Sequence, residues 1–407
     1  MPFRMPDSKT VTVIKVIGVG GAGGNAINRM VDNQLQGVDF IAANTDKQAL
    51  DQSRADLCLH LGPEETKGLG AGADPEVGLM AAKESRAVIE QALQGSHMVF
   101  IAAGLGGGTG TGAAPVVAEI SKNLGALTVA VVTKPFAAEG KARANNAQAG
   151  WQELRKHVDT IITIPNDRLL VCMDKNDKFE DMLAKVDNVL LEAVKGITDL
   201  INVPGLINAD FADLKTIMKE VGPAVMGSGL ASGEGRASEA AKMAVDNELL
   251  EECGVDGARG LIINISASKE TLTMAEFIET STCIQQKVDE SAKIVIGASY
   301  DDDLGDKLRV TVVATGVGNV QKKNTINPLE GRGQKAMSQG SHGPEALSRS
   351  VSASPNVHPS LPKLPSSKFE NYDALGSSDV PNGRSVDMYK QNSEIFERPA
   401  YLRKKAN

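Results

Sequence analysis

The sequence predicts an α/β protein: a Rossmann-like parallel sheet, then a long helix, then a smaller α+β domain. Three observations support this fold class. Apolar runs alternate with helix-like segments through the first 165 residues, which is typical of strands covered by helices on both faces. Two glycine-rich segments each follow directly on such a run. The 407 residues include 41 glycines but only 3% aromatic side chains, so the core must be mainly aliphatic.

The alternation defines the first half of the chain. β-Branched and apolar runs predict strands over residues 11–17, 38–43, 99–103, 127–133 and 160–165. Helix-like segments between them predict helices over residues 25–32, 76–93 and 113–123. This order predicts a parallel, doubly wound sheet.

The second half begins with a long helix. Apolar residues recur at helical spacing over residues 179–201, so we expect one helix that could join two domains. An ordinary surface helix is the alternative. Further strands and helices are then predicted over residues 259–266, 307–315, 237–251 and 274–288. They predict a smaller α+β domain that ends near Gly318.

The last part of the chain has a different composition. Residues 321–393 hold seven prolines and 13 serines and few branched apolar residues, which predicts a disordered linker. Apolar residues return at the end beside basic ones, in EIFERPAYLRKKAN. An apolar and basic segment after such a linker predicts a short docking motif.

Charge and cysteine content exclude several classes of protein. The net charge is −8, divided into −13 for residues 1–320 and +5 for residues 321–407, so a duplex-DNA binder is not expected. The four cysteines form no C-x-x-C pair and have no zinc spacing, so we expect reduced core thiols. No run of 18 apolar residues and no signal-peptide core occurs, and a cytoplasmic protein is expected.

The first glycine-rich segment runs from Gly18 to Asn25 as GVGGAGGN, between a predicted strand and a helix. Glycines let a phosphate approach the backbone, and a helix N-terminus offers free N–H groups. The pattern is similar to the dinucleotide-binding fingerprint, and Asp46 supplies the acidic residue expected near the end of the second strand. A dinucleotide-dependent oxidoreductase is therefore one open hypothesis.

The second segment, residues 104–112, reads GLGGGTGTG and again joins a strand to a helix. Two such turns in one sheet predict several phosphates held from two sides, whereas a dinucleotide fold needs only one. The P-loop pattern with its lysine is absent from the sequence. The six glycines would cost much chain entropy without a ligand to contact.

With these two segments the chain resembles the FtsZ family, bacterial relatives of tubulin that polymerise with GTP. The resemblance covers about residues 11–318 and the final dozen, and implies a tubulin/FtsZ-like fold, GTP hydrolysis, head-to-tail filaments and a bacterial division ring. It implies GTP or GDP as ligand, with Mg²⁺ held through the phosphates and no direct metal ligand. The GTP-binding residues that it implies are Gly20, Gly21, Ala22, Gly23, Gly24, Asn25, Asn44, Asp46, Ala71, Gly72, Gly104, Gly106, Gly107, Gly108, Thr109, Gly110, Thr111, Thr133, Pro135, Glu139, Arg143, Asn166, Leu183 and Asp187.

The resemblance also implies a division of the chain. The expected segments are a flexible N-terminus (1–10), a GTP-binding domain (11–177), a central helix (178–203), a catalytic loop with the following helix (204–221), a C-terminal α+β domain (222–318), a disordered linker (319–394) and a partner-docking peptide (395–407).

A third motif, GLINADFAD at residues 205–213, looks like the family's catalytic loop, which enters the nucleotide site of the neighbouring subunit. The implied catalytic residues are Asn208, Asp210 and Asp213. Asp210 and Asp213 are three residues apart, so at a helix start they share a face and could orient a water molecule. The alternative is that Asn208 or Asp210 only caps the next helix.

Two further motifs match positions near the ribose and the base. Glu139 and Arg143 match the family's pair near ribose and phosphates, although their spacing also permits a surface salt bridge. Asp187 can accept both N1–H and the 2-amino group of guanine. Leu183 stands one helical turn earlier, where the family commonly has a stacking Phe.

Other positions also depart from the family pattern. Asp74 replaces a usual Asn and Trp151 a usual small residue; Asp74 would either repel phosphates or help to hold Mg²⁺. The C-terminal residues resemble the family's tail peptide, which docks onto membrane-anchoring division proteins on the inner face of the membrane at mid-cell. The residues implied for this contact are Ile395, Phe396, Pro399, Tyr401, Leu402 and Arg403. A paralogue that assembles without hydrolysing GTP is the remaining alternative.

Overall fold

The computed structural model describes residues 12–170, 178–202, 207, 209–220, 222–247, 255, 257–289 and 291–317. The predicted linker and tail peptide lie outside these residues, as do Asn208, Cys172 and Cys253. In the described part, ten strands form one sheet in the order β3-β2-β1-β4-β5-β6-β7-β10-β8-β9.

Six strands form the N-terminal part of the sheet, and all their pairings are parallel. They are β1 (Ile14–Val19), β2 (Asp39–Asn44), β3 (Leu57–His60), β4 (Met98–Gly104), β5 (Leu127–Lys134) and β6 (Thr160–Pro165). The order 3-2-1-4-5-6 is that of a Rossmann sheet, which confirms the predicted fold class.

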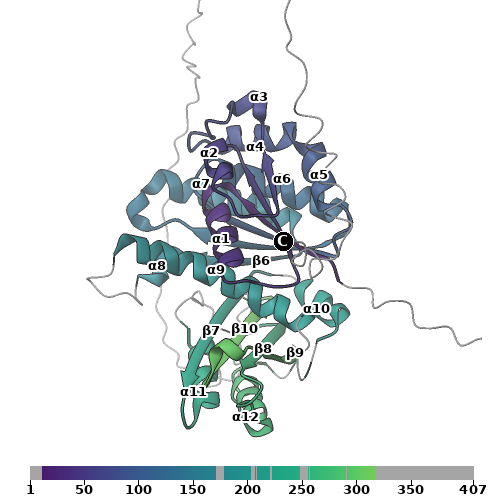
Figure 1. Cartoon of the computed structure of the whole chain (residues 1–407), viewed down its shortest axis with the longest axis vertical. Helices are drawn as coiled ribbons and strands as arrows, with labels where there is room; N and C mark the ends of the chain where they lie inside the picture. The colour runs from purple at the N-terminus through teal and green to yellow at the C-terminus, as the bar shows by residue number, and fades with distance from the viewer. Residues whose placement is uncertain are drawn as a thin grey trace, which may run out of the picture. The chain divides into compact units, whose positions relative to one another are not determined.

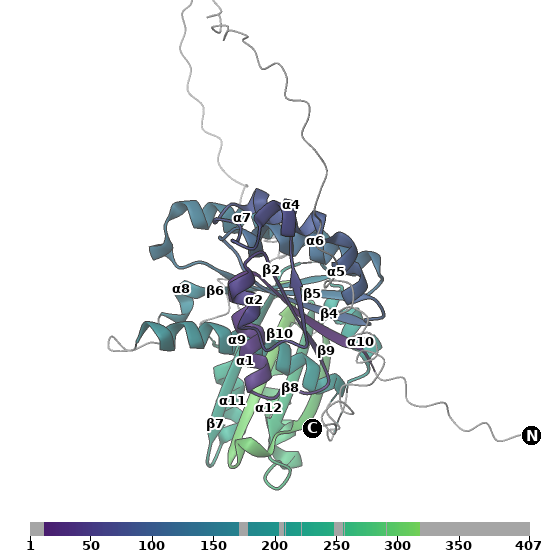
Figure 2. The same cartoon turned by 45° about the horizontal axis from the view of Figure 1, so that its top comes forward.

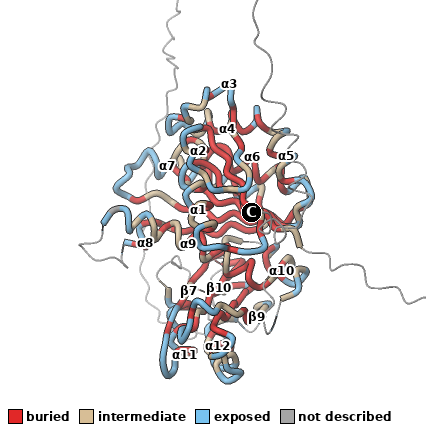
Figure 3. Tube along the Cα trace, in the orientation of Figure 1, coloured by how far each residue is buried: buried red, intermediate tan, exposed pale blue. Residues whose placement is uncertain are grey.

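Helices cover both faces of this sheet (Figures 1 and 2). They are α1 (Gly20–Asp32), α2 (Lys47–Asp51), α3 (Pro63–Thr66), α4 (Pro75–Glu84), α5 (Arg86–Leu93), α6 (Thr109–Asn123), α7 (Lys141–His157), α8 (Asn166–Leu169) and the short 3₁₀ turn η1 (Ala137–Glu139). Side chains of α1 share one core with alternate strand residues such as Val16, and those of α4–α7 share a second core with residues such as Ile17. The central strands β1, β4 and β5 are buried on both faces, as Figure 3 shows, and their residues are mainly apolar.

The C-terminal part of the sheet contains β7 (Ala224–Ser232), β8 (Gly260–Ala267), β9 (Lys293–Tyr300) and β10 (Lys307–Thr315). β10 pairs antiparallel with β7 and β8, and β8 pairs parallel with β9. The helices α11 (Arg236–Val245) and α12 (Met274–Gln285) close a third core over one face, and the 3₁₀ turn η2 (Asp302–Leu304) precedes β10. The two parts of the sheet meet at the single pair Ile162–Ala224.

The long helix α9 (Phe179–Asn202) joins the two parts, as one of the two sequence hypotheses predicted. In Figure 1 it crosses the middle of the molecule. Its buried residues Leu190, Val194 and Ile197 belong to the same core as Val16 of β1 and Ile262 of β8. The following helix α10 (Phe211–Met218) also packs into this core.

Some sequence predictions were wrong in detail. α1 begins at Gly20 rather than residue 25 and α6 at Thr109 rather than residue 113, because the glycine-rich segments themselves form the first helical turns. The helix predicted over residues 76–93 is two helices separated at Ser85, whose hydroxyl accepts a hydrogen bond from Gly62 N. α11 ends at Val245 and α12 at Gln285, before the predicted ends at residues 251 and 288.

The cysteine prediction was half right. Cys58 and Cys283 are free thiols, but Cys58 is exposed and Cys283 only partly buried, so neither is a core residue. Cys58 lies on β3, a short strand at the edge of the sheet, where one face has no full helical cover.

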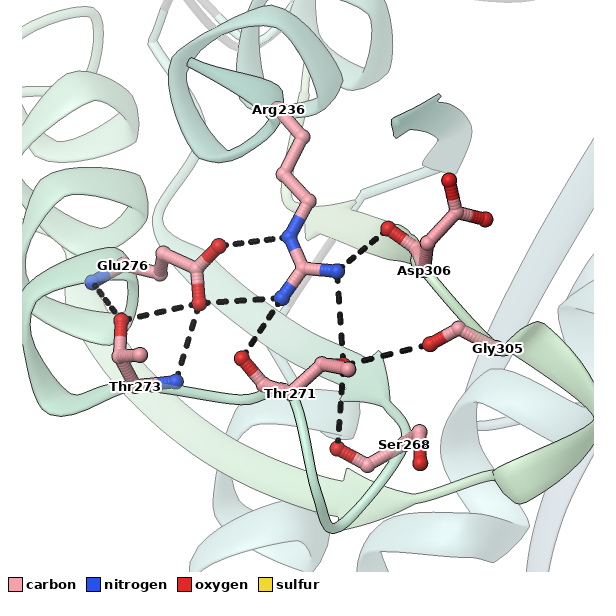
Figure 4. A network of polar contacts seen from close by, with 7 residues as sticks. All are labelled: Arg236, Ser268, Thr271, Thr273, Glu276, Gly305 and Asp306. Carbon is pink, nitrogen blue, oxygen red and sulfur yellow. Dashed lines mark hydrogen bonds and ion pairs between the residues drawn. The ribbon is translucent and has the colours of Figure 1, made fainter. Parts of the chain in front are cut away.

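In the C-terminal part, the side chain of Arg236 is the centre of a hydrogen-bond network that links two helices and a turn (Figure 4). Arg236, at the start of α11, is only 6% exposed. Its Nε donates to Glu276 Oε1 at 2.6 Å, and its terminal nitrogens donate to Thr271 O at 2.8 Å and to Asp306 O. Glu276 also caps α12 through Thr273. One side chain thus joins α11, α12 and the turn before β10.

Candidate functional site

The carboxyl ends of the parallel strands gather most of the predicted nucleotide-binding residues at one edge of the sheet. Gly20 follows β1, Asn44 ends β2, Gly104 ends β4, Thr133 lies near the end of β5, and Asn166 follows β6. Ligands of open α/β sheets bind at this edge, at the point where the strand order reverses. Here the reversal lies between β1 and β4, the two strands that carry the glycine-rich segments.

The two glycine-rich segments are in direct contact. Gly20 has φ +75°, and a Cβ there would lie 2.9 Å from Gly110 N, so only glycine fits. A Cβ on Gly104 would lie 2.7 Å from the Cβ of Ala22. Thr109, in the second segment, has its hydroxyl 2.6 Å from that of Thr45 after β2. The pair of segments therefore forms one backbone surface.

Two more loops complete this surface. A Cβ on Gly108 would lie 2.7 Å from the Cβ of Ala71 and 2.9 Å from Asp74 N. On the other side, a Cβ on Gly106 would lie 3.2 Å from Pro135 Cγ. Four glycines of these loops instead face open space, with nothing within 4 Å of a Cβ: Gly21, Gly24, Gly72 and Gly107. A ligand could approach the backbone at these positions.

The helices that start at this surface differ in how their N-termini are bound. α1 and α6 have no side-chain cap and no acidic residue in the first turn. Their first N–H groups and the positive ends of their dipoles are thus available to an anion. Neighbouring α2 and α4 are capped by the carboxylates of Asp46 and Asp74. This arrangement suits phosphates on α1 and α6.

Asp46 and Asp74, two residues with predicted ligand roles, both cap helices. Asp46, which the dinucleotide hypothesis assigned to a ribose, accepts hydrogen bonds from Gln48 N at 2.8 Å and Ala49 N at 3.4 Å. Asp74 accepts from Glu76 N at 2.9 Å, so its carboxylate serves the α4 helix end. Both carboxylates thus cap helices in this structure, and their roles toward a ligand stay predictions.

The predicted base-binding residues lie on α8 and α9. Asn166 is 7% exposed and its Oδ1 has no hydrogen-bond partner, so a buried acceptor is left for a ligand. Asp187 is partly buried, and burial raises its pKa to about 6 while the nearby Arg29 charge opposes the rise. Leu183 is 42% exposed, which leaves its side chain open to a planar base.

Glu139 and Arg143 form the salt bridge that was the alternative interpretation. Arg143 donates to Glu139 Oε2 at 2.5 Å, and Glu139 Oε1 accepts from Phe136 N at 2.9 Å. Arg143 stays largely exposed next to Gly106, so the pair sits at the rim of the glycine surface. Contact with a ribose stays a prediction.

The predicted catalytic aspartates are far from this edge along the sheet. Asp210 caps α10 by accepting from Ala212 N at 3.3 Å, as the capping alternative proposed, and Asp213 is exposed in the first turn. α10 packs against β8 and β9. The carbonyl of its last residue, Met218, accepts a hydrogen bond from Thr160, at the amino end of β6. Asn166, a predicted base-binding residue, follows the carboxyl end of the same strand. Figure 1 shows α10 away from α2–α4.

Two residues near the site were not predicted from spacing. Arg29 donates from Nε to Asn188 Oδ1 at 2.7 Å and so links α1 to α9. Trp151 donates to Thr163 Oγ1 at 2.8 Å and lies between the cations of Lys134 and Arg155. Arg29 follows Asn25 by one helical turn, but no local spacing contains its contact with Asn188.

The described residues contain neither a preformed metal-binding cluster nor a membrane-spanning helix. These residues contain no group of three or more His, Cys, Asp or Glu side chains placed to hold a metal ion. No helix among them is both long and apolar enough to span a bilayer.

Comparisons with known proteins agree with this architecture. Residues 13–174 match the model of the Tubulin/FtsZ family, GTPase domain, and residues 222–318 match that of the FtsZ family, C-terminal domain. The chain is 52% identical over 333 residues to cell division protein FtsZ of Buchnera aphidicola, covering 82% of this chain and 86% of that protein. It is 52% identical over 317 residues to that of Pseudomonas aeruginosa, covering 78% and 80%.

Solved structures give the same result. The FtsZ dimer of M. jannaschii, described as empty, superposes with a TM-score of 0.73 at 45% identity, covering 76% of this chain and 89% of that one. CetZ2 from Haloferax volcanii has a TM-score of 0.62 over 76% of this chain and 94% of that chain, at 18% identity, and shows only the shared fold.

A Rossmann-type sheet with two glycine loops, a long central helix and a second α+β part defines a GTPase of the tubulin/FtsZ class. Within that class the chain belongs to the FtsZ family. It is a cell-division GTPase of the family whose members polymerise and build the bacterial division ring. The oxidoreductase hypothesis is excluded by this assignment.

Proposed function

We propose that the glycine surface of one subunit binds GTP and that Asp210 and Asp213 of the next subunit complete the catalytic site. The observation that carries this proposal is the position of α10. It is bound to the amino end of β6, whereas the glycine loops follow the carboxyl ends of the strands. A head-to-tail contact is heterologous, so it can bring the two ends together in a filament.

In this proposal the first turns of α1 and α6 hold the phosphates through backbone N–H groups. Glu139 and Arg143 lie at the rim, toward the ribose. The ionised Asp187 accepts N1–H and the 2-amino group of guanine, and the unpaired Oδ1 of Asn166 faces the same end. Adenine lacks this pair of donors, so the arrangement favours GTP over ATP.

Hydrolysis then depends on positioning and charge rather than on covalent chemistry. Asp210 and Asp213, with Asn208, orient a water molecule toward the neighbour's γ-phosphate. Asp213 is exposed and free to face a neighbour. Mg²⁺ on the phosphates would neutralise charge that develops there.

The remaining expectations concern the C-terminal peptide and the place of action. Ile395, Phe396, Pro399, Tyr401, Leu402 and Arg403 would dock onto membrane-anchoring division proteins. This would hold the filaments in the cytoplasm, on the inner face of the membrane at mid-cell. An aromatic–aliphatic anchor with a basic rim supports the docking role.

A subunit-mixing experiment tests the shared site. Asp213→Ala keeps the glycine surface, whereas Gly107→Val adds a side chain in the open space beside it and leaves α10 intact. Each variant alone should have little GTPase activity. An equimolar mixture should recover up to about a quarter of the wild-type rate, because one contact in four joins two intact halves.

Two controls accompany this test. Glu90→Ala, at an exposed position of α5, should leave the rate unchanged. The wild-type rate per subunit should fall on dilution below the assembly concentration, as followed by light scattering. Absence of recovery in the mixture, together with a rate independent of dilution, would place the whole site in one subunit.

A further inference from the structure

We infer that Arg29 is a positioning residue for guanine recognition: it fastens the phosphate-binding helix α1 to the base-facing helix α9 and keeps Asp187 in its charged form. The inference rests on the proposed role of Asp187. Arg29 is not among the predicted site residues. In this inference it sets the pH range over which the site binds a guanine nucleotide.

The contact itself is specific. Arg29 Nε donates to Asn188 Oδ1 at 2.7 Å, across 159 positions of sequence, and both side chains are partly buried. Asn188 is the residue next to Asp187 on α9. Arg29 lies in the last turn of α1, whose first turn is the proposed phosphate site. A single hydrogen bond therefore joins the helix that holds phosphates to the helix that reads the base.

The electrostatic argument begins with burial. Burial raises the pKa of Asp187 to about 6, and the positive charge of Arg29 opposes that rise. The α9 positions one turn before and after Asp187 are uncharged: Leu183, Ala184, Leu190 and Leu191. On the neighbouring α8, Asp167 and Arg168 are exposed to solvent. Burial and the Arg29 charge are thus the causes that set the pKa of Asp187, and of these two only the Arg29 charge favours the carboxylate.

The chemical consequence follows from the two forms of the carboxyl group. The carboxylate accepts two N–H groups of guanine, whereas the protonated form gives up one acceptor and presents a donor to them. A base that covers the pocket removes water and favours the neutral form further. Without Arg29, the pKa of Asp187 would rise toward neutrality, and guanine binding would weaken in the lower part of the physiological pH range.

The experiment measures the dissociation constant of GDP, by calorimetry on the full chain below its assembly concentration, from pH 5.5 to 8.5. Wild-type affinity should fall as the pH decreases through about 6. For Arg29→Gln the fall should begin at higher pH, so that binding is about threefold weaker than wild type near pH 6.5 and nearly equal at pH 8.5.

Two matched variants separate the charge from the hydrogen bond. Arg29→Lys keeps the charge and should have a nearly wild-type pH profile. Asn188→Ala removes the acceptor and keeps the charge, so its affinity should change by the same factor at every pH. The inference is overturned if Arg29→Gln leaves the profile in place, or if Arg29→Lys displaces it as far as Arg29→Gln does.

A further variant separates this inference from the function on which it rests. Asp187→Asn should abolish the pH dependence and the preference for GDP over IDP, which lacks the 2-amino group. If Asp187→Asn binds GDP like the wild type, the proposed base contact is wrong, and the role of Arg29 is overturned with it. If that variant behaves as expected while Arg29→Gln does not, only the role of Arg29 is overturned.

Discussion

At the scale of single residues, the proposed base-binding end of the site combines a residue predicted from the sequence, Asp187, with one that was not, Arg29. Asp187 was identified from its place on the long helix, because a carboxylate matches the donors of guanine. Arg29 was not, because its significance depends on a contact with Asn188 across 159 positions, which no local spacing contains. The position of Asp187 was thus predictable from the sequence. The charge of Arg29 that acts on it could be recognised only from the three-dimensional structure.

Leu183 provides a residue-scale prediction. Its side chain is 42% exposed on α9, one turn before Asp187, and an aliphatic group cannot stack on a base as a ring does. Leu183→Phe should strengthen GDP binding by about two- to tenfold, since an aromatic pair contributes about 0.5–1.5 kcal/mol beyond burial. Calorimetric titration with GDP measures the change.

The control for this change is Leu230→Phe, because Leu230 is a leucine of similar exposure (40%) on β7 in the C-terminal part of the sheet. It should leave GDP affinity unaltered. Equal affinities of Leu183→Phe and wild type would mean that the base does not lie over this turn of α9.

At the scale of helices and strands, helix ends separate binding segments from structural ones. α2, α4, α10 and α12 have side-chain caps, whereas α1 and α6 have none at the glycine surface. Other helices such as α5, α7 and α11 are also uncapped, so a missing cap indicates a phosphate site only together with the glycine segments. The sequence showed both glycine segments at strand–helix junctions, but not that the glycines form the first helical turns. Uncapped N-termini of two long helices at one edge are a physical reason for phosphate binding that does not depend on resemblance.

The sequence analysis missed three strands, β3, β7 and β9, and for β7 the cause is a weak side-chain pattern. β7, with the sequence AVMGSGLAS, was missed because small residues give no clear alternation. It is a strand because all nine residues pair with β10, and because Gly227 and Gly229 let α11 approach: a Cβ there would lie 1.9 Å and 2.1 Å from α11 carbonyl oxygens. Such tertiary causes cannot be seen in a local sequence window.

The Arg236 network gives a prediction at this scale. Burial raises the pKa of Glu276, but hydrogen bonds from Arg236 and Thr273 outweigh it and hold that pKa below 4.5. Stability from this carboxylate is therefore present above pH 4.5 and lost as pH falls through the lowered pKa. Arg236→Met should cost about 1.5–3 kcal/mol at pH 7, because it removes the charged hydrogen bonds of Arg236 and leaves the partly buried Glu276 without its cation.

Urea unfolding at pH 7 and pH 4 measures this cost, which should be smaller at the lower pH. The double change Arg236→Met with Glu276→Gln should recover part of the stability at pH 7, because no unpaired charge remains. A cost that is the same at both pH values would show that Arg236 acts through packing alone.

At the scale of the whole molecule, charge is distributed unevenly along one chain. Residues 1–320 carry −13 and residues 321–407 carry +5. Head-to-tail assembly brings copies of the acidic part together, so repulsion opposes filament growth whenever ionic screening is weak. The Debye length falls from about 30 Å at 0.01 M salt to about 10 Å at 0.1 M, so added salt weakens this repulsion.

The critical concentration for assembly should therefore fall as KCl is raised from about 50 to 300 mM, within a fewfold range set by this screening. Sedimentation of filaments formed with GTP at fixed Mg²⁺ measures it, and a second monovalent chloride separates screening from any preference for K⁺. A chain ending at residue 320 should respond more steeply, because it keeps the −13 charge and lacks the compensating +5. If the critical concentration instead rises with salt in both chains, attractive ion pairs across the contact outweigh the repulsion between the acidic parts.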